Sequence, residues 1–254
     1  MTLTDDGLEL SAPVNLRDMG GIPIAGGTLR DGLVIRADDL ALADEASASR
    51  LVDGGLAAVI DLRSAGEFAN TGRGPLGRMR VTYHHLPFMD AVDSSAQVPG
   101  SDLLDQSTFA AMYIRMYEAA AARIVTSLAV IATAPGATAF HCAAGQDRTG
   151  VLAASLLLAL GAEHDAIVDD YARTGANSSA IMARLAPVMG PMMAALGIEL
   201  DEAARASMRK EFSPEPMKGL LHHLSASYRD PLEPLRRAGL NDAIVAMLRE
   251  RALG

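Results

Sequence analysis

The stretch that decides the fold is His141-Cys142-Ala143-Ala144-Gly145-Gln146-Asp147-Arg148-Thr149-Gly150. A mainly apolar run at 137–140 precedes it, and an apolar run at 151–160 follows and ends at Gly161. The first run is typical of a buried β-strand, and the second is typical of a buried helix with a glycine cap. The sequence therefore predicts a strand, a short loop and a helix in direct succession.

A loop of this kind suits a phosphate group. Where a strand passes through a tight loop into a helix, successive backbone N–H groups point into one hollow at the helix N-terminus. Gly145 permits the tight curl, with a positive φ, and Arg148 can return its guanidinium to donate two hydrogen bonds to the same anion. The residues expected to line this hollow are Ala143, Ala144, Gly145, Gln146, Asp147 and Arg148.

Cys142 lies at the entrance to the same loop. Helix N-termini and cationic neighbours lower the pKa of a cysteine thiol from ~8.5 to between ~3.5 and ~7.5. Because the thiolate is the nucleophile, Cys142 is predicted to attack phosphorus while Arg148 and the loop amides stabilise the oxygens. The alternatives are an inert buried thiol and a surface ion pair for Arg148. His141 is expected to support the thiolate or simply to end the strand.

The rest of the chain alternates short β-rich runs with helical stretches, which predicts an α/β fold. Strands are expected at 33–36, 57–60, 81–86 and 137–140. Helices are expected at 40–52, at 109–132 with Ser107 as N-cap, at 149–160, and over most of the chain after 162. We expect breaks at Pro187 and at Gly190-Pro191, and a mobile loop at 90–106. Residues 15–21 are expected to form a structural turn in which Arg17 and Asp18 make a local ion pair.

Composition excludes several classes of protein. The 254 residues carry a net charge of −9, which disfavours binding to nucleic acid or to an anionic membrane surface. The single cysteine excludes an internal disulfide and a multi-cysteine metal site. The start of the chain lacks the basic and apolar regions of a signal peptide, and the run at 151–160 is shorter than the ~20 residues that span a bilayer. A cytoplasmic protein without stable membrane insertion is the default expectation, although export without a signal peptide leaves no mark in a sequence.

Three stretches together resemble the protein tyrosine phosphatase superfamily, and more narrowly its bacterial PtpB-like family. They are Asn-Leu-Arg-Asp-Met-Gly-Gly at 15–21, Ile-Asp-Leu-Arg-Ser at 60–64 and the loop at 141–150. The resemblance implies one phosphatase domain over 1–254, with a central, mostly parallel sheet of about four strands flanked by helices. It also implies a helical lid insertion at about 163–212, and we expect 180–208 to form part of a mobile lid.

The resemblance implies hydrolysis of phosphate monoesters in two steps through a cysteinyl-phosphate, with inorganic phosphate as product and no metal or other cofactor. Thr149 would assist departure of the thiolate in the second step. The expected activity is that of a tyrosine or dual-specificity phosphatase, with phosphotyrosine proteins as the favoured substrates. The alternatives are a phosphoinositide phosphatase and a weakly active protein that only binds phospho-ligands. The intact Cys142, Asp147 and Thr149 argue against the last.

The sequence offers more than one candidate for the general acid that protonates the leaving oxygen. Many tyrosine phosphatases supply it from a Trp-Pro-Asp loop, but this chain has no Trp. Members of the resembled family have an acid inside the phosphate loop and another at the end of a strand, and are thought to use the first. We therefore expect Asp147 to be the general acid and Asp61 to support or orient it. The alternative for Asp61 is a structural pairing with Arg63 or another base. Asp90 and Asp93 are a third possibility for the general acid.

Gln146 departs from the family pattern. PtpB-like proteins usually carry lysine at this position, and that lysine is linked in the family to binding additional phosphates, as on phosphoinositides. A neutral amide can still donate hydrogen bonds, but it removes a positive charge from the rim of the pocket. Gln146 therefore makes phosphoinositides less favoured as substrates. The alternative is that its side chain points to solvent and has little effect on substrate choice.

Overall fold

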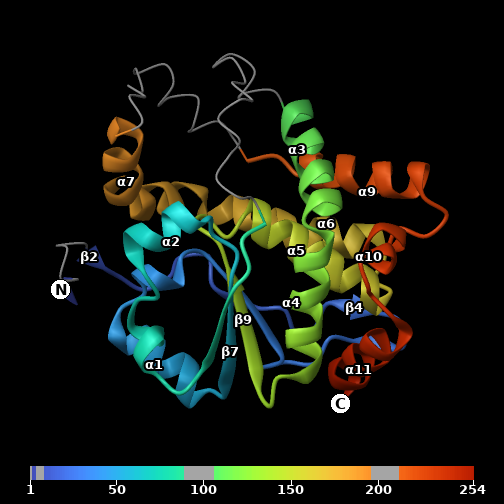
Figure 1. Ribbon diagram of the computed structural model, residues 1–254, viewed down its shortest axis with the longest axis horizontal. Helices are drawn as coiled ribbons and strands as arrows, with labels where there is room; N and C mark the ends of the chain where they lie inside the picture. The colour runs from blue at the N-terminus through green and yellow to red at the C-terminus, as the bar shows by residue number, and fades with distance from the viewer. Residues whose placement is uncertain (1, 4–8, 89–105, 196–211) are drawn as a thin grey trace.

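A five-stranded sheet forms the centre of the computed structural model, which describes residues 2–3, 9–88, 106–195 and 212–254 (Figure 1). The strand order is β3-β6-β9-β7-β8. The bounds are β3 (Arg17–Asp18), β6 (Val34–Ala37), β9 (Ala137–His141), β7 (Leu56–Asp61) and β8 (Thr82–His85). The last four strands run parallel, and β3 pairs antiparallel with β6. The predicted α/β fold with a mostly parallel sheet is confirmed, and all four expected strands are present.

Helices cover both faces of the sheet because successive side chains of each strand point to opposite faces. Val59 and Ala139 pack on the side of α1 (Glu45–Asp53), whereas Ile60 and Phe140 belong to the larger core on the other side. Figure 1 shows α1 and α2 on the left of the sheet, and α4, α10 and α11 on its right. The helices of the larger core are α3 (Gln106–Ala119), α4 (Ala121–Thr133), α5 (Asp147–Leu160), α6 (His164–Ala172), α9 (Glu215–Ser227), α10 (Glu233–Arg237) and α11 (Asp242–Leu253).

Shorter elements complete the described chain. Two small hairpins pair β1 (Thr2–Leu3) with β2 (Glu9–Leu10) and β4 (Pro23–Ile24) with β5 (Gly27–Thr28). The remaining helical segments are α2 (Ala65–Thr71), α7 (Ser178–Ala195), and the 3-10 turns η1 (Leu40–Leu42), η2 (Pro75–Arg78) and η4 (Arg173–Asn177). Most of the described chain beyond residue 162 is helical, as predicted.

Helix α5 is the element that positions the loop. It begins at Asp147 and is buried over almost its whole length, including Val151, Leu152 and Leu156. Gly161 ends it in the left-handed conformation, with φ of +77°. The predicted buried helix and its glycine cap are confirmed, so the loop before α5 is anchored on the core of the protein.

Three helix predictions need correction. The stretch at 40–52 splits into η1 and α1 because the Asp44 side chain accepts from the N–H of Ser47, 2.7 Å away, and starts a new helix. The stretch at 109–132 is two helices that meet at Ala120, and Ser107 lies inside α3 rather than capping it. Helix α7 continues through both expected breaks, at Pro187 and at Gly190-Pro191, since a helix can accommodate a proline's missing hydrogen bond by bending.

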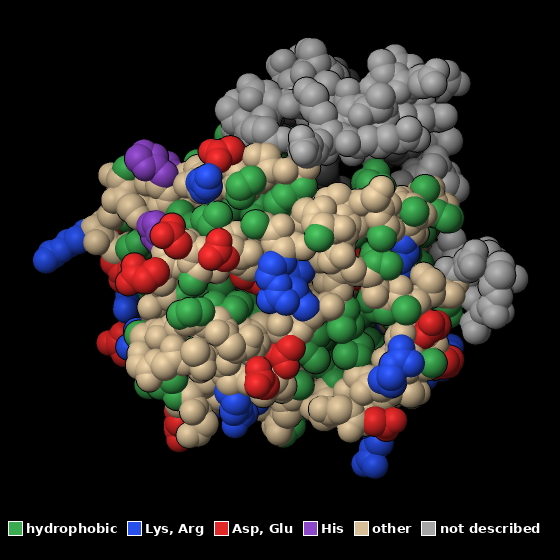
Figure 2. Space-filling view, turned by 180° about the vertical axis from the view of Figure 1, so that it is seen from behind, with side chains coloured by type: hydrophobic (Ala, Val, Ile, Leu, Met, Phe, Trp, Pro, Cys, Tyr) green, Lys and Arg blue, Asp and Glu red, His purple; other side chains and the backbone are tan. Residues whose placement is uncertain are grey.

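Within the described ranges, no single helix is long and apolar enough to cross a bilayer; the segments 109–119 and 121–133 pass that test only together, across a bend of 71°. Figure 2 shows the face opposite to that of Figure 1. Among its coloured residues, Lys and Arg side chains are interspersed with Asp and Glu and do not gather into one basic patch. The described residues of that face therefore form no continuous positive surface of the kind that binds a nucleic-acid backbone.

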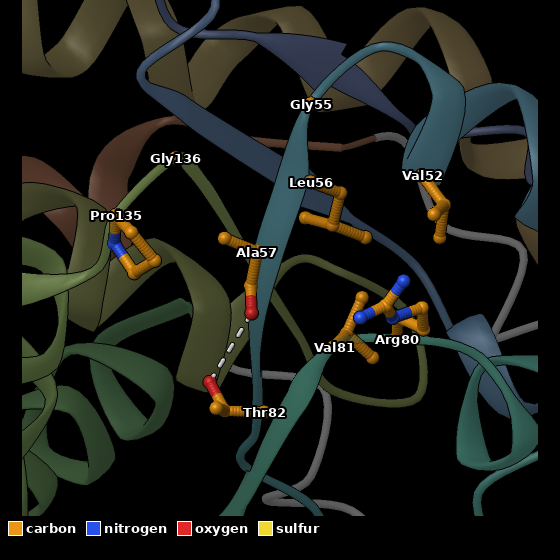
Figure 3. A pocket seen from close by; sticks show the side chains of 9 residues that line it. All are labelled: Val52, Gly55, Leu56, Ala57, Arg80, Val81, Thr82, Pro135 and Gly136. Atoms are coloured by element: carbon orange, nitrogen blue, oxygen red, sulfur yellow. Dashed lines mark hydrogen bonds between the residues drawn. The ribbon is translucent and has the colours of Figure 1, made fainter.

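An open pocket lies at the amino ends of β7 and β8, where Val52, Arg80 and Pro135 contribute to its lining (Figure 3). The Thr82 hydroxyl donates to the Ala57 carbonyl, 3.2 Å away, across the two strands there. Cys142 follows the carboxyl end of β9, at the opposite edge of the parallel sheet. Ligands of parallel sheets bind outside the carboxyl ends of the strands, so this pocket is separate from the predicted site.

Candidate active site

The loop that leaves β9 carries Cys142, which is 1% exposed, and curls directly into α5. Gly145 has a φ of +68°, so the predicted positive φ is confirmed. A Cβ atom at Gly145 would lie only 2.5 Å from the carbonyl oxygen of Ala37 on β6. Glycine is therefore required there both for the backbone conformation and for the close approach of the loop to the sheet.

The carbonyl groups of this loop are held from outside by the N-terminal part of the chain. The Asn15 side-chain amide donates to the carbonyls of Ala144 and Gly145 at 3.1 and 3.3 Å. The Arg36 guanidinium donates to the Gly145 carbonyl at 3.0 Å, and the Asp39 N–H donates to the Ala143 carbonyl at 2.9 Å. Because these carbonyls point outward, the neighbouring backbone N–H groups can point to the inner side of the loop. An anion site requires this arrangement.

Asn15 is itself fixed from several directions. Its side-chain oxygen accepts from Arg17, 2.7 Å away, and from Asn177, 3.4 Å away. Its backbone N–H donates to the Asp38 carboxylate at 3.0 Å. The stretch at 15–21 was expected to be structural; here its first residue braces the phosphate loop.

The expected ion pair between Arg17 and Asp18 is wrong. These residues form β3, in which adjacent side chains point to opposite faces. Arg17 instead pairs with Asp170 of α6 at 3.2 Å, and Asp18 accepts from the backbone N–H groups of Gly20 and Gly32. The buried Arg36 pairs with the other oxygen of Asp170, so one carboxylate links both arginines beneath the loop.

Arg148 lies on the first turn of α5 and makes a bidentate ion pair with Glu67 of α2, at 2.5 and 2.9 Å. Burial would raise the pKa of Glu67, but the hydrogen bonds and charge of Arg148 lower it to about 2. Glu67 also forms a capping box with Ser64, accepting from the Ser64 N–H at 2.8 Å. The sequence analysis did not identify Glu67; the Ser64-x-x-Glu67 spacing typical of a capping box was the available signal.

Asp147, the half-buried first residue of α5, accepts a hydrogen bond from the Tyr113 hydroxyl, with 2.6 Å between the oxygens. Withdrawal from water raises the pKa of Asp147, although Tyr113 and Arg148 both oppose the shift. A carboxyl group with a raised pKa holds its proton at higher pH, which is what a general acid needs.

Asp61 lies behind the loop rather than in it, opposite His141 on the neighbouring strand. It accepts three hydrogen bonds from Arg63, at 2.6 to 3.0 Å, and one from the Tyr83 hydroxyl at 2.9 Å. Burial would raise the pKa of Asp61, but its charged and hydrogen-bonded neighbours hold it well below the ordinary range. The geometry favours the structural pairing with Arg63 over a role as proton donor.

His141 and Thr149 flank the loop from inside the core. The His141 Nδ1 atom lies 3.3 Å from both the Leu40 backbone nitrogen and the Cys142 carbonyl oxygen, and Nε2 lies 3.8 Å from an Asp61 oxygen. Burial lowers the pKa of His141, so the ring is neutral. The Thr149 hydroxyl is fully buried and has no hydrogen-bond partner within the described part of the chain.

The first half of α7 packs against the loop. Ile181 and Leu185 form a small apolar cluster with Leu42, against which Ala143 and Ala144 pack. Arg184 reinforces the contact by pairing with Asp38 at 2.6 Å. The expected lid at 180–208 thus begins on a helix docked beside the loop. Residues 196–208 of that segment and the acid candidates Asp90 and Asp93 lie outside the described residues.

These features define a class: a cysteine and an arginine on a tight loop between a parallel strand and a buried helix. The model of the tyrosine phosphatase family matches residues 8–254, and the chain belongs to this family. It is a cysteine-dependent protein-tyrosine phosphatase, a class whose reaction passes through a cysteinyl-phosphate.

Two relatives are similar over most of their length. The triple specificity protein phosphatase PtpB of Mycobacterium tuberculosis is 31% identical over 213 residues, which cover 71% of this chain and 74% of the relative. A candidate tyrosine-protein phosphatase of Cupriavidus necator is 31% identical over 207 residues, covering 76% of this chain and 75% of the relative. The resemblance seen in the three sequence stretches is confirmed.

Proposed function

We propose that this phosphatase hydrolyses phosphotyrosine in proteins, with Cys142 as nucleophile and Asp147 as general acid. The observation that carries the proposal is the loop itself, whose carbonyls are held outward and whose arginine is held by Glu67. Preorganised donors of this kind stabilise charge that develops on the equatorial oxygens without rearrangement during the reaction.

In the first step, the Cys142 sulfur bonds to phosphorus as the bond from phosphorus to the leaving oxygen breaks. Asp147 passes its proton to that oxygen, and Arg148 and the loop amides hold the transferred phosphoryl group. In the second step, water attacks phosphorus, its proton returns to Asp147, and the thiolate departs with inorganic phosphate as product. The Thr149 hydroxyl, which has no hydrogen-bond partner among the described residues, is available to stabilise the departing thiolate.

Substrate preference depends on the rim of the loop. The relative from M. tuberculosis is named for triple specificity, which makes serine, threonine or lipid phosphates competing substrates to test here. Gln146 contributes no positive charge for a second phosphate, and it is half-buried rather than fully exposed to solvent. These features support phosphotyrosine above phosphoinositides.

The test measures phosphate release by the wild type and by Cys142→Ser from an aryl phosphate, a phosphopeptide panel and a phosphoinositide. We expect the wild type to prefer phosphotyrosine peptides and the variant to release none while still binding inorganic phosphate. Faster release from the phosphoinositide would overturn the substrate assignment. Phosphate binding without release from any substrate would instead identify a binding protein.

A further inference from the structure

Two buried tyrosines stand behind Asp147, on helices that lie beside α5 (Figure 1). Tyr113 of α3 is fully buried, and its hydroxyl lies between an Asp147 oxygen at 2.6 Å and the Tyr171 hydroxyl at 2.7 Å. Because a hydroxyl has one proton and Tyr113 donates it to Asp147, Tyr171 must donate to Tyr113. The hydrogen bonds therefore run in one direction, from Tyr171 through Tyr113 to Asp147.

Packing fixes this chain of hydrogen bonds in place. The Tyr171 ring of α6 meets the Tyr113 ring edge-on, with centroids 6.1 Å apart. Phe212 packs on Tyr171 with its ring centroid 5.1 Å away, and a Cβ atom added at Gly150 would lie 3.0 Å from the Tyr171 ring. The absence of a side chain at Gly150 lets α5 approach the tyrosine closely, so neither hydroxyl can be displaced without moving a core element.

The direction of the hydrogen bonds decides which oxygen of Asp147 is free. Since Oδ1 accepts from Tyr113, a proton carried by Asp147 resides on Oδ2. Among the described residues, the ionisable groups that face Asp147 are the two tyrosines, from α3 and α6, and the neighbouring Arg148 of α5. After Oδ2 gives up its proton, the Tyr113 hydroxyl still donates to Oδ1 and stabilises the carboxylate that remains.

We propose that Tyr113, supported by Tyr171, is a positioning residue that orients the Asp147 carboxyl for proton transfer and stabilises its ionised form. The inference rests on the proposed role of Asp147 as general acid. Proton balance is unchanged from that mechanism: Oδ2 protonates the leaving oxygen and is reprotonated by the attacking water. Tyr113 keeps its own proton throughout.

The test compares Tyr113→Phe with Tyr117→Phe. Tyr117 lies one turn further along α3, is equally buried, and donates to the Pro231 carbonyl at 3.0 Å instead of to Asp147. Each variant loses one buried tyrosine hydroxyl, and both tyrosines lie on the same helix. Melting temperatures show whether each variant is folded. Rates are measured as a function of pH on two aryl phosphates, one with a good and one with a poor leaving group.

We expect Tyr113→Phe to lower kcat/KM roughly tenfold on the poor leaving group, a part of the ~10²–10⁴-fold that general acid catalysis contributes, and to change it little on the good one. Removal of the Tyr113 donor raises the pKa of Asp147. Activity on the poor leaving group should therefore persist to a higher pH before it declines. Tyr171→Phe should act in the same direction but less strongly. Tyr117→Phe should leave both kinetic signatures unchanged.

The contrary results separate the inference from the proposed function. Identical rates and pH profiles for Tyr113→Phe and Tyr117→Phe would overturn the inference alone, provided Asp147→Asn still slows only the poor leaving group. An equal loss on both substrates in Asp147→Asn would overturn the acid assignment together with the inference. Absence of phosphate release by the wild type would overturn the proposed function itself.

Discussion

Glu67 holds both terminal nitrogens of Arg148, one with each carboxylate oxygen. This pairing uses one N–H of each terminal nitrogen and leaves the N–H groups on the Nε side of the guanidinium free to donate to a phosphate. One arginine can therefore pair with a carboxylate and bind an anion at the same time. Glu67 therefore orients Arg148 before substrate arrives. Burial by itself would lower the pKa of Arg148, but the Glu67 hydrogen bonds raise it, so the guanidinium stays charged.

Replacement of Glu67 by Gln should lower kcat/KM about tenfold on good and poor leaving groups alike, because one charge-assisted hydrogen bond is worth ~1.5–3 kcal/mol. Glutamine can still complete the capping box with Ser64, so α2 should keep its start. Ser64→Ala is the matched control, since it weakens the cap and retains the Arg148 pair. A rate loss in Ser64→Ala as large as that in Glu67→Gln would assign the effect to the helix instead.

Gly145→Ala should abolish activity, because the added Cβ would meet the Ala37 carbonyl at 2.5 Å and push the loop out of shape. Gly32→Ala controls for backbone conformation: Gly32 has a similar φ of +71°, and nothing lies within 4 Å of its Cβ position. Both variants should lose ~1–2 kcal/mol from the left-handed conformation. Steady-state kinetics and denaturant unfolding should show lost activity at Gly145 alone; full activity in both would contradict the close approach.

Asn15→Asp should lower both kcat/KM and phosphate affinity, each by roughly tenfold. The substitution keeps the acceptor for Arg17 but removes two donors to the loop carbonyls, each worth ~0.5–1.5 kcal/mol, and adds a negative charge beside them. Asn177→Ala removes only the 3.4 Å contact with Asn15 and should have a small effect. Phosphate inhibition constants and kinetics distinguish them, and unaltered binding in Asn15→Asp would refute the bracing role.

The stability of the fold should fall as the pH drops below about 6.5, the ordinary pKa of histidine. His141 is buried with a lowered pKa, so the unfolded chain binds its proton more readily than the folded protein. Stability is therefore complete above the unfolded pKa and declines toward the folded one, by at most ~1.4 kcal/mol per pH unit. Urea unfolding across this range should show the slope, and His141→Gln should remove that slope whereas a substitution at the exposed His222 should keep it.

Local patterns predicted the part of the fold that depends on neighbouring residues. The four parallel strands, the buried helix α5 and its Gly161 cap all have signals within a few residues of the chain. The two-residue strand β3 was missed because its pairing with β6 is a tertiary contact and it is too short to show alternation. Pro187 was read as a break because helix continuity through proline depends on surrounding structure.

The candidate site divides in the same way. The loop from Cys142 to Thr149 is contiguous, so its residue types and spacing could be interpreted directly. Glu67, Asn15 and Tyr113 act on that loop from distant segments, and no spacing rule connects them to it. The sequence favoured Asp147 over Asp61 as the acid through its place in the loop and the family resemblance, but the surroundings of the two carboxyl groups appear only in the structure. Asp61 accepts hydrogen bonds from Arg63, whereas Asp147 is withdrawn from water and accepts one from Tyr113.

The brace around Asn15 has a consequence for how the enzyme is made. Asn15 contacts Gly145 and Asn177 across 130 and 162 residues, and Arg17 contacts Asp170 across 153. Contacts between residues so far apart in the sequence form late in folding. A long loop must first close, at a cost in entropy, before such a contact can stabilise the fold. During synthesis the N-terminal segment cannot make these contacts until most of the chain has been produced. The active site should therefore be completed as one of the last events of folding, after the helices themselves have formed.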